Sequence, residues 1–150
     1  MIHKKRREEL LSKLGDDAVV IVSTNSEQKR NSDVNYPFRP DSSFWYLTGF
    51  IEPDAIAVFS KNNYSIFLRP KDKTQEIWNG VRLGVDLAPE TLLVDYAYDI
   101  TIFTDEIKKL IIKNRLYILI NQLLMAGKIE QVLIFLIKLL FQFLVAVFNL

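Results

Sequence analysis

Apolar positions at the start of the chain first repeat with the spacing of a helix and then become continuous. Leu10, Leu11 and Leu14 fall on one face of a helix, and Gly15 supplies the residue at which that helix should end. Every residue of the next run, 18–22, is hydrophobic. Because a strand with one solvated face would alternate, this run predicts a strand that is buried on both faces.

The middle of the chain carries strand signals on either side of a polar turn. The polar segment 25–35 should form a loop. Residues 55–59 and 64–68 are two β-prone runs, and the short segment between them is rich in asparagine. These two runs should therefore pair as a hairpin.

Capping signals predict two further helices. Asp72 can cap a short helix that stops at Gly80, and Gln75 occupies the position of a capping box. A second helix should begin near Thr104, with acids in its first turn, and the run 116–120 resembles one more strand. Helices interleaved with strands in this order predict an α/β fold, a mixed β-sheet flanked by α-helices.

The composition is that of an ordinary folded domain. Hydrophobic residues make up 49% of the 150 residues, charged residues 25%, and the formal net charge is +1. So small a charge offers no field for nucleic acid, and the basic cluster 4–7 should be a solvated helix face because Glu8 and Glu9 follow it. The same acids stand where a secretory signal would have its apolar segment. Together with the absence of cysteine, this predicts a cytoplasmic protein without disulfides.

The sequence offers no set of residues that could carry catalysis. Its single histidine, His3, lies near a terminus that should fray, so neither a catalytic triad nor a histidine-assisted metal site has a base. The carboxylates show no metal-ligand spacing, and no phosphate-binding glycine pattern occurs. We therefore expect no catalytic residue, no metal ligand and no cofactor in this chain, which should be inactive alone.

One segment concentrates the aromatic residues of the chain. Residues 36–50 hold six of the 18 aromatic side chains, mixed with Arg39, Asp41 and Gly49. In one interpretation the rings are core anchors and Gly49 permits a tight turn. In the other, some rings face a cleft, while Arg39 and Asp41 pair to hold the loop.

Two blocks of the sequence resemble signatures of the N-terminal domain of Xaa-Pro aminopeptidases, which has a creatinase/prolidase-like fold. The first block spans 36–55 and the second 76–84, in the order and at the distance that the family shows. The resemblance covers roughly residues 1–114. The positions that carry it are Tyr36, Pro37, Arg39, Asp41, Ser42, Phe44, Trp45, Gly49, Glu52, Pro53, Gly80, Arg82 and Gly84.

The resemblance implies roles that composition and spacing do not supply. It implies a mixed sheet with flanking helices, packed on a larger "pita-bread" catalytic domain that holds two manganese ions. Trp78 would help to wall the substrate cleft, and Asp33 would lie near the cleft of a neighbouring subunit. Without the resemblance, Trp78 is equally well explained as a core tryptophan of a short helix. For Asp33, a solvated loop carboxylate is the favoured explanation. The expected partners are the family's catalytic domain or further copies of the chain, and a peptide substrate only in the full-length enzyme.

The composition changes sharply toward the end of the chain. Residues 129–150 include 17 apolar residues out of 22, and Glu130 is the one acidic residue after Glu106. The resemblance fails in this region. The chain should therefore divide into a family domain over 1–114 and a divergent apolar tail over 115–150, which is either a frameshift product or a hydrophobic helix.

The apolar tail has two alternative fates. Residues 132–148 are barely long enough to span a membrane, and burying Lys138 there would cost roughly 2.5–3.5 kcal/mol. This cost favours an apolar helix that packs on the sheet, self-associates or causes aggregation over a membrane span.

Two functions remain open from the sequence. The favoured one is the N-terminal accessory domain of a manganese-dependent Xaa-Pro aminopeptidase, cut off before the catalytic part, which shapes the substrate cleft and oligomer contacts. The alternative is a stand-alone structural or binding domain whose aromatic segment and apolar tail contact a protein or a membrane. A catalytic domain supplied in trans would make the chain part of an enzyme after all.

Overall fold

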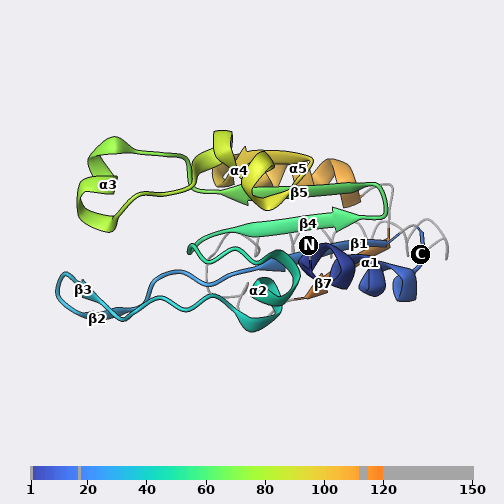
Figure 1. Ribbon diagram of the computed structural model, residues 1–150, viewed down its shortest axis with the longest axis horizontal. Helices are drawn as coiled ribbons and strands as arrows, with labels where there is room; N and C mark the ends of the chain where they lie inside the picture. The colour runs from blue at the N-terminus through green and yellow to red at the C-terminus, as the bar shows by residue number, and fades with distance from the viewer. Residues whose placement is uncertain (1, 17, 112–114, 120–150) are drawn as a thin grey trace, which may run out of the picture.

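The computed structural model describes residues 2–16, 18–111 and 115–119, and a five-stranded mixed sheet lies at its centre (Figure 1). In spatial order the strands are β6 (Tyr96–Asp99), β5 (Asn63–Leu68), β4 (Ile56–Ser60), β1 (Ala18–Ser23) and β7 (Arg115–Leu119). Strand β4 runs antiparallel to both of its neighbours, β1 and β5, while the outer strands β6 and β7 run parallel to theirs. The predicted mixed sheet and its hairpin are confirmed.

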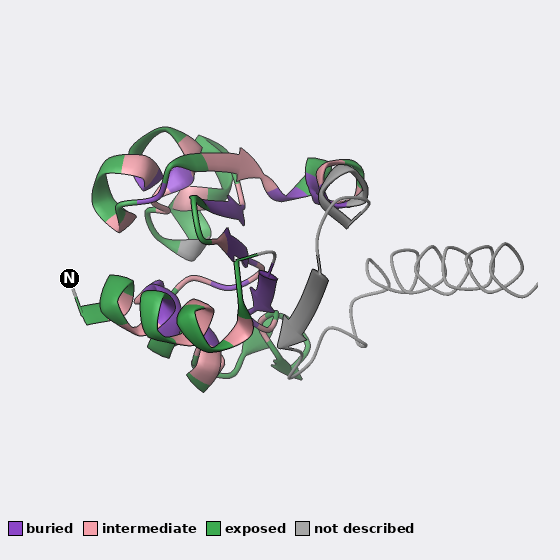
Figure 2. Ribbon diagram, turned by 90° about the vertical axis from the view of Figure 1, so that its right-hand side faces the viewer, coloured by how far each residue is buried: buried purple, intermediate pink, exposed green. Residues whose placement is uncertain are grey.

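Strand β1 is buried along its whole length because helices cover both faces of the sheet (Figure 2). Successive side chains of a strand point to opposite faces. Val20 and Val22 accordingly belong to one hydrophobic core, while Val19 and Ile21 belong to the other. The unbroken apolar run predicts this double burial, and the structure confirms it.

Different helices cover the two faces. On one face lie α1 (Ile2–Leu14), α2 (Ser42–Thr48) and α4 (Gly84–Leu92), and α1 packs its leucines against that core. A short 3-10 helix, η1 (Ile100–Ile102), and α5 (Phe103–Ile111) cover the other face, where Phe103 and Ile107 are buried. The helix predicted near Thr104 thus begins one residue earlier, and α4 is an element that the capping signals did not predict.

The basic start of α1 packs on the C-terminal end of α2. The Arg7 Nη1 atom donates to the carbonyl oxygen of Leu47 at 2.7 Å, and Arg6 Nη1 donates to that of Tyr46 at 3.1 Å. The His3 Nδ1 atom lies 2.9 Å from the same Tyr46 oxygen. Since the last carbonyls of a helix lack helical partners, these contacts cap α2. The expectation of a solvated face is therefore wrong for Arg7, which is buried, and His3 is held in place rather than frayed.

Two segments leave the sheet toward the same end of the domain (Figure 1). The segment expected to be a loop forms a small hairpin instead, β2 (Lys29–Asn31) and β3 (Val34–Asn35). We call residues 28–36 the β2–β3 arm. Residues 69–83 contain α3 (Lys73–Asn79) and form the α3 arm.

Strand β7 lies beyond residue 114, where the sequence places the end of the domain, and it pairs in parallel with β1. The apolar tail over 120–150, including the helix expected there, lies outside the described residues. Within the ranges that the structure describes, no helix is both long enough and apolar enough to cross a membrane.

Candidate functional site

Trp78 stands on the α3 arm with its side chain in solvent. The Asp72 carboxylate caps α3 by accepting hydrogen bonds from the backbone N–H groups of Thr74 at 2.9 Å and Gln75 at 3.3 Å. Gly80, with a φ of +80°, follows the last turn and ends the helix. Trp78 is 83% exposed, so the alternative of a core tryptophan is wrong.

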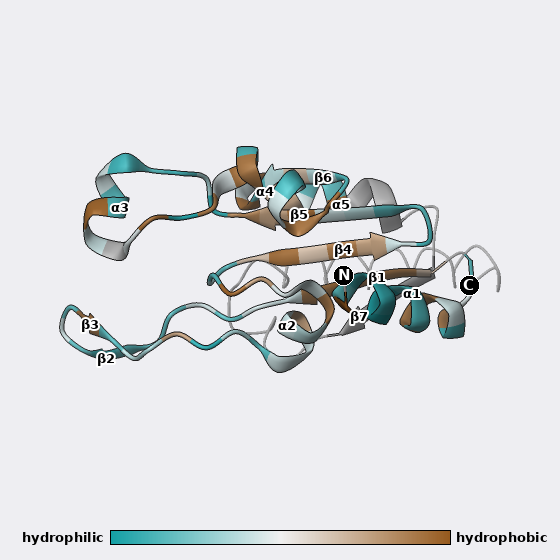
Figure 3. Cartoon of the chain, viewed as in Figure 1, coloured by the Kyte–Doolittle hydropathy of each residue, from teal (hydrophilic) through white to brown (hydrophobic). Residues whose placement is uncertain are grey.

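Two apolar neighbours accompany Trp78 on this arm. Ile77 is 78% exposed and Val81 is 81% exposed. Figure 3 shows the hydrophobic colour on α3, outside the sheet and its two cores. Because apolar side chains gathered on a surface mark a site of contact, the tip of the α3 arm is a candidate surface for a ligand or a partner.

Asp33 stands on the other arm, at the turn between β2 and β3. It is exposed, as are all residues of the two strands, and the preceding Ser32 has a φ of +39°. An exposed carboxylate agrees both with a solvated loop and with a cleft that forms only beside another domain. The two candidate cleft residues therefore occupy separate arms that extend toward the same end of the sheet (Figure 1).

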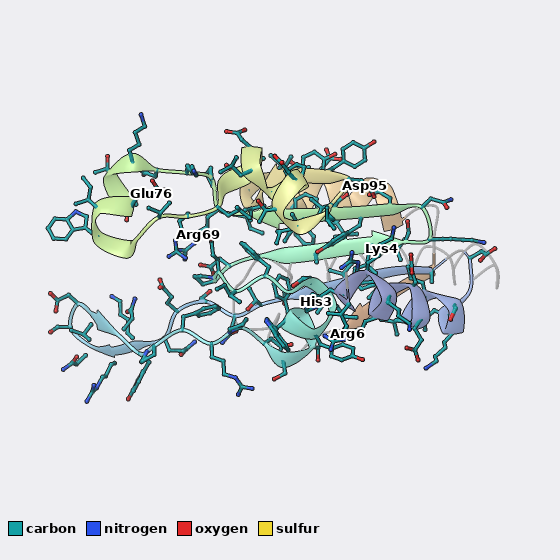
Figure 4. The ribbon with its side chains drawn as sticks, in the orientation of Figure 1. His3, Lys4, Arg6, Arg69, Glu76 and Asp95 are labelled. Atoms are coloured by element: carbon teal, nitrogen blue, oxygen red, sulfur yellow. The ribbon has the colours of Figure 1, made fainter. Side chains whose placement is uncertain are left out.

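Ion pairs connect the bases of the two arms. In Glu27, just before β2, Oε1 lies 3.8 Å from Arg82 Nη2 and Oε2 lies 4.0 Å from Arg69 Nη1. Arg69 also forms a hydrogen-bonded ion pair with Asp54, and Figure 4 shows Arg69 pointing from the α3 arm toward the β2–β3 arm. Burial, and after it the nearby charge of Arg82, lowers the pKa of Arg69, while Glu27 acts in the opposite direction.

Two carboxylates from the signature blocks hold the returning leg of the α3 arm. Glu52 Oε1 accepts a hydrogen bond from the Leu83 N–H at 2.7 Å, and Glu76 Oε1 accepts one from the Arg82 N–H at 3.0 Å. A cavity of about 260 Å³ lies beneath α3, and its lining includes both Arg69 and Arg82. The base of the arm is thus built from charged groups, whereas its tip is apolar.

In the first signature block, Asp41 caps α2. Its Oδ1 atom accepts hydrogen bonds from the Ser43 N–H at 2.8 Å and the Phe44 N–H at 3.0 Å, while Arg39 donates to Ser42 Oγ at 3.2 Å. The first signature block therefore caps the N-terminus of α2, and side chains of α1 cap its C-terminal end.

The aromatic rings of this block differ in burial, and the core interpretation holds for some of them. Phe44 and Phe50 are buried core anchors, whereas Tyr36, Trp45 and Tyr46 are about half exposed. Of the other motif positions, Pro53 and Gly84 are buried, Gly49, Glu52 and Arg82 are partly buried, and Pro37 and Gly80 are exposed.

Sequence reasoning missed the cluster of charged residues at the base of the arms, although it singled out Arg82 as a signature position. Glu27, Arg69 and Arg82 come from three segments that no spacing rule connects, so their proximity depends on the fold. Asp54 lies within the first signature block and has a φ of +54°, an unusual conformation for a residue other than glycine. Its place in the block was the signal that could have pointed to this cluster.

No metal site emerges from the described part of the chain. Within it, no three or more histidine, cysteine, aspartate or glutamate side chains are grouped so that they could hold a metal ion. The described residues therefore offer no binding site for the two manganese ions, which the resemblance assigns to the catalytic domain.

Comparison with known proteins gives a consistent result. The family model for the aminopeptidase P N-terminal domain matches residues 3–118. The Xaa-Pro aminopeptidase of Haemophilus influenzae is 43% identical over 115 residues, which are 74% of this chain and 26% of that protein. The Xaa-Pro aminopeptidase of Escherichia coli is 42% identical over 99 residues, covering 63% of this chain and 22% of that protein.

A solved structure shows the same fold. Aminopeptidase P from Escherichia coli with the inhibitor Pro-Leu superposes with a TM-score of 0.79 and 31% identity, over 86% of this chain and 31% of that one. The chain spans about a quarter of the length of the curated relatives named above. The sheet, the capped helices and these matches together establish that the chain belongs to the aminopeptidase P N-terminal domain family.

Proposed function

We propose that this domain forms part of the substrate cleft of an Xaa-Pro aminopeptidase and that catalysis belongs to another part of that enzyme. The observation that carries the proposal is the exposure of Trp78, which is 83% accessible on a helix with caps at both ends. Neither Trp78 nor its apolar neighbours contribute to the two cores. A helix that keeps its largest side chains outside the domain serves a contact with something else.

The two arms carry groups that suit a peptide ligand. The indole ring of Trp78 is a large apolar surface that can exclude water and pack against a proline ring. The carboxylate of Asp33 can bind a peptide amine or orient an arginine. Both would meet the substrate when a catalytic domain stands beside the arms, either in the same enzyme or in a neighbouring copy of a homo-oligomer.

The same proposal assigns manganese to the catalytic domain. Two manganese ions would supply the Lewis acid for hydrolysis there, and this domain would supply walls and charge. The single imidazole, at His3, is engaged with the Tyr46 carbonyl rather than with a carboxylate cluster. We place this activity in the cytoplasm, with which a sequence free of cysteine is compatible.

A chimeric enzyme tests the role of Trp78. Residues 3–118 would replace the matching segment of the Haemophilus influenzae Xaa-Pro aminopeptidase. Replacing Trp78 by alanine should raise KM for an Xaa-Pro peptide about 3- to 10-fold, because one aromatic packing contact is lost. The matched control is Trp45→Ala, which removes the other tryptophan of the chain, on α2, and should leave KM nearly unchanged.

Two results would contradict the proposal. Equal effects of the two tryptophan substitutions on KM would remove the assignment of Trp78 to the cleft. Turnover of an Xaa-Pro peptide by the 150-residue chain alone, in the presence of manganese, would overturn the assignment of catalysis to another part of the enzyme.

A further inference from the structure

We propose that Glu27 is a positioning residue that sets the separation of the α3 arm and the β2–β3 arm. The proposal concerns the geometry of this domain, and its consequence for peptide binding rests on the proposed function.

Glu27 lies where both arms begin. The next residue, Gln28, accepts a hydrogen bond from the Tyr36 N–H at 2.9 Å, which closes the base of the β2–β3 arm. The two carboxylate oxygens of Glu27 each face one guanidinium, at 3.8 Å for Arg82 and 4.0 Å for Arg69. Arg69 is the first residue of the α3 arm and Arg82 lies next to its last. One carboxylate therefore bridges both legs of the α3 arm to the base of the other arm.

The charge balance at this point makes Glu27 the important member. Arg69 and Arg82 are close enough to repel each other, and the charge of Arg82 is, after burial, a cause of the lowered pKa of Arg69. The side chains of Arg82 and Glu27 are 14% and 27% exposed, so water screens these charges less than at an open surface. Without Glu27, Arg82 would lose its ion pair at the base of the β2–β3 arm, while Arg69 would stay there through Asp54. The repulsion between the two guanidiniums would then push the returning leg of the α3 arm away from that base.

A second set of contacts anchors Arg69 to the same segment. Arg69 pairs with Asp54, whose carboxylate accepts a hydrogen bond from Ser26 Oγ. The Asp54 N–H donates to the Asn25 carbonyl oxygen at 3.2 Å. The outgoing leg is thus tied to residues 25–27 at two points, through Asp54 and through Glu27. Arg82, on the returning leg, reaches this segment through its ion pair with Glu27.

The absence of cysteine allows a direct measurement of the arm separation. Asn31→Cys in β2 and Lys73→Cys in α3 place two spin labels on exposed positions, one on each arm, in a chain with no other thiol. Pulsed electron paramagnetic resonance then gives the distribution of distances between the labels. The parent chain should show one narrow distribution, and Glu27→Gln should shift it to longer distances and broaden it.

Matched variants separate this effect from a general loss of structure. Glu8→Gln removes an exposed carboxylate that pairs with Lys4 at 4.0 Å on α1, and it should leave the distribution unchanged. Glu27→Asp keeps the charge but shortens the side chain, and should give an intermediate width. Adding Arg82→Gln to Glu27→Gln removes the repulsion and should narrow the distribution again.

The outcomes distinguish this inference from the proposed function. A distribution in Glu27→Gln that matches the parent chain, or a double variant as broad as Glu27→Gln alone, would overturn the positioning role. In the chimeric enzyme, Glu27→Gln should raise KM more than it lowers kcat. Broadened distances with an unchanged KM would leave the positioning role standing and count against the cleft function of the arms.

Discussion

Arg7 Nη1 donates a hydrogen bond to the carbonyl oxygen of Leu47 at 2.7 Å, from a side chain that is buried. The carbonyl belongs to the last turn of α2. The positive charge of Arg7 there also interacts favourably with the negative end of the helix dipole. The same guanidinium lies 3.9 Å from the centre of the Tyr64 ring in β5. One side chain of α1 thus joins α2 to the sheet.

Replacing Arg7 by methionine should destabilise the domain. Methionine keeps the apolar stem but removes the donor, so the Leu47 carbonyl loses its charged partner and the free energy of unfolding should fall by about 1.5–3 kcal/mol. Urea unfolding followed by circular dichroism measures this change. Lys5→Met, at an exposed position of the same helix, is the control and should stay close to the parent value. Equal losses in the two variants would refute the capping role of Arg7.

Gly49 should not tolerate a side chain, for two separable reasons. Its φ of +75° is left-handed, which costs other residues roughly 1–2 kcal/mol. A Cβ atom there would also lie 2.8 Å from the ring of His3. Gly49→Ala should therefore lower the free energy of unfolding by more than the backbone cost alone.

A double-mutant cycle separates the two contributions for Gly49. In a His3→Ala background the ring is absent, so Gly49→Ala should cost only the backbone penalty. An equal cost in both backgrounds would show that the close approach of His3 to Gly49 does not contribute.

Tyr64 should make the domain sensitive to alkaline pH. Burial raises the pKa of Tyr64 to about 12, against a smaller opposing influence of Arg7. Between pH 10 and about 12 the unfolded chain releases this proton while the folded chain keeps it, so stability falls as pH rises through that window, by up to about 3 kcal/mol in total. Denaturant unfolding of the parent chain at several pH values should show this loss, and Tyr64→Phe should show less of it.

The same substitution should cost little at neutral pH. The hydroxyl oxygen of Tyr64 is buried with no hydrogen-bond partner among the described residues. Phenylalanine keeps the ring that packs against Phe59 and Arg7. Tyr64→Phe should therefore equal or slightly exceed the parent in stability at pH 7, and a clear loss there would point to a partner for the hydroxyl.

The sequence predicted the parts of this fold that depend on local patterns. The unbroken apolar run of β1 predicts burial on both faces because each alternate side chain needs its own core. Asp72 and Gly80 predict α3 because capping acts within one turn. The signature blocks predict the family through resemblance rather than through physical chemistry.

What the sequence could not predict depends on contacts between distant segments. Arg7 looked like one of several solvated basic residues, and its burial follows from α2, which lies 40 residues further along the chain. The pairing of β2 with β3 has no apolar face to reveal it, since every residue of both strands is exposed. Glu27, Arg69 and Arg82 meet only after the sheet has formed.

The caps of α2 and α3 should differ in what their loss does to the domain. Asp41→Ala removes the cap of a helix that buries Phe44 and Leu47, so the free energy of global unfolding should fall by about 0.5–2 kcal/mol. Asp72→Ala removes an equivalent cap from α3, whose described side chains are not buried, so it should loosen that helix locally and leave global unfolding nearly unchanged. Amide hydrogen exchange measured by NMR should show faster exchange at Glu76 and Gly80 in Asp72→Ala alone. Equal losses of global stability in the two variants would mean that the α3 arm unfolds together with the core and is not a separate arm.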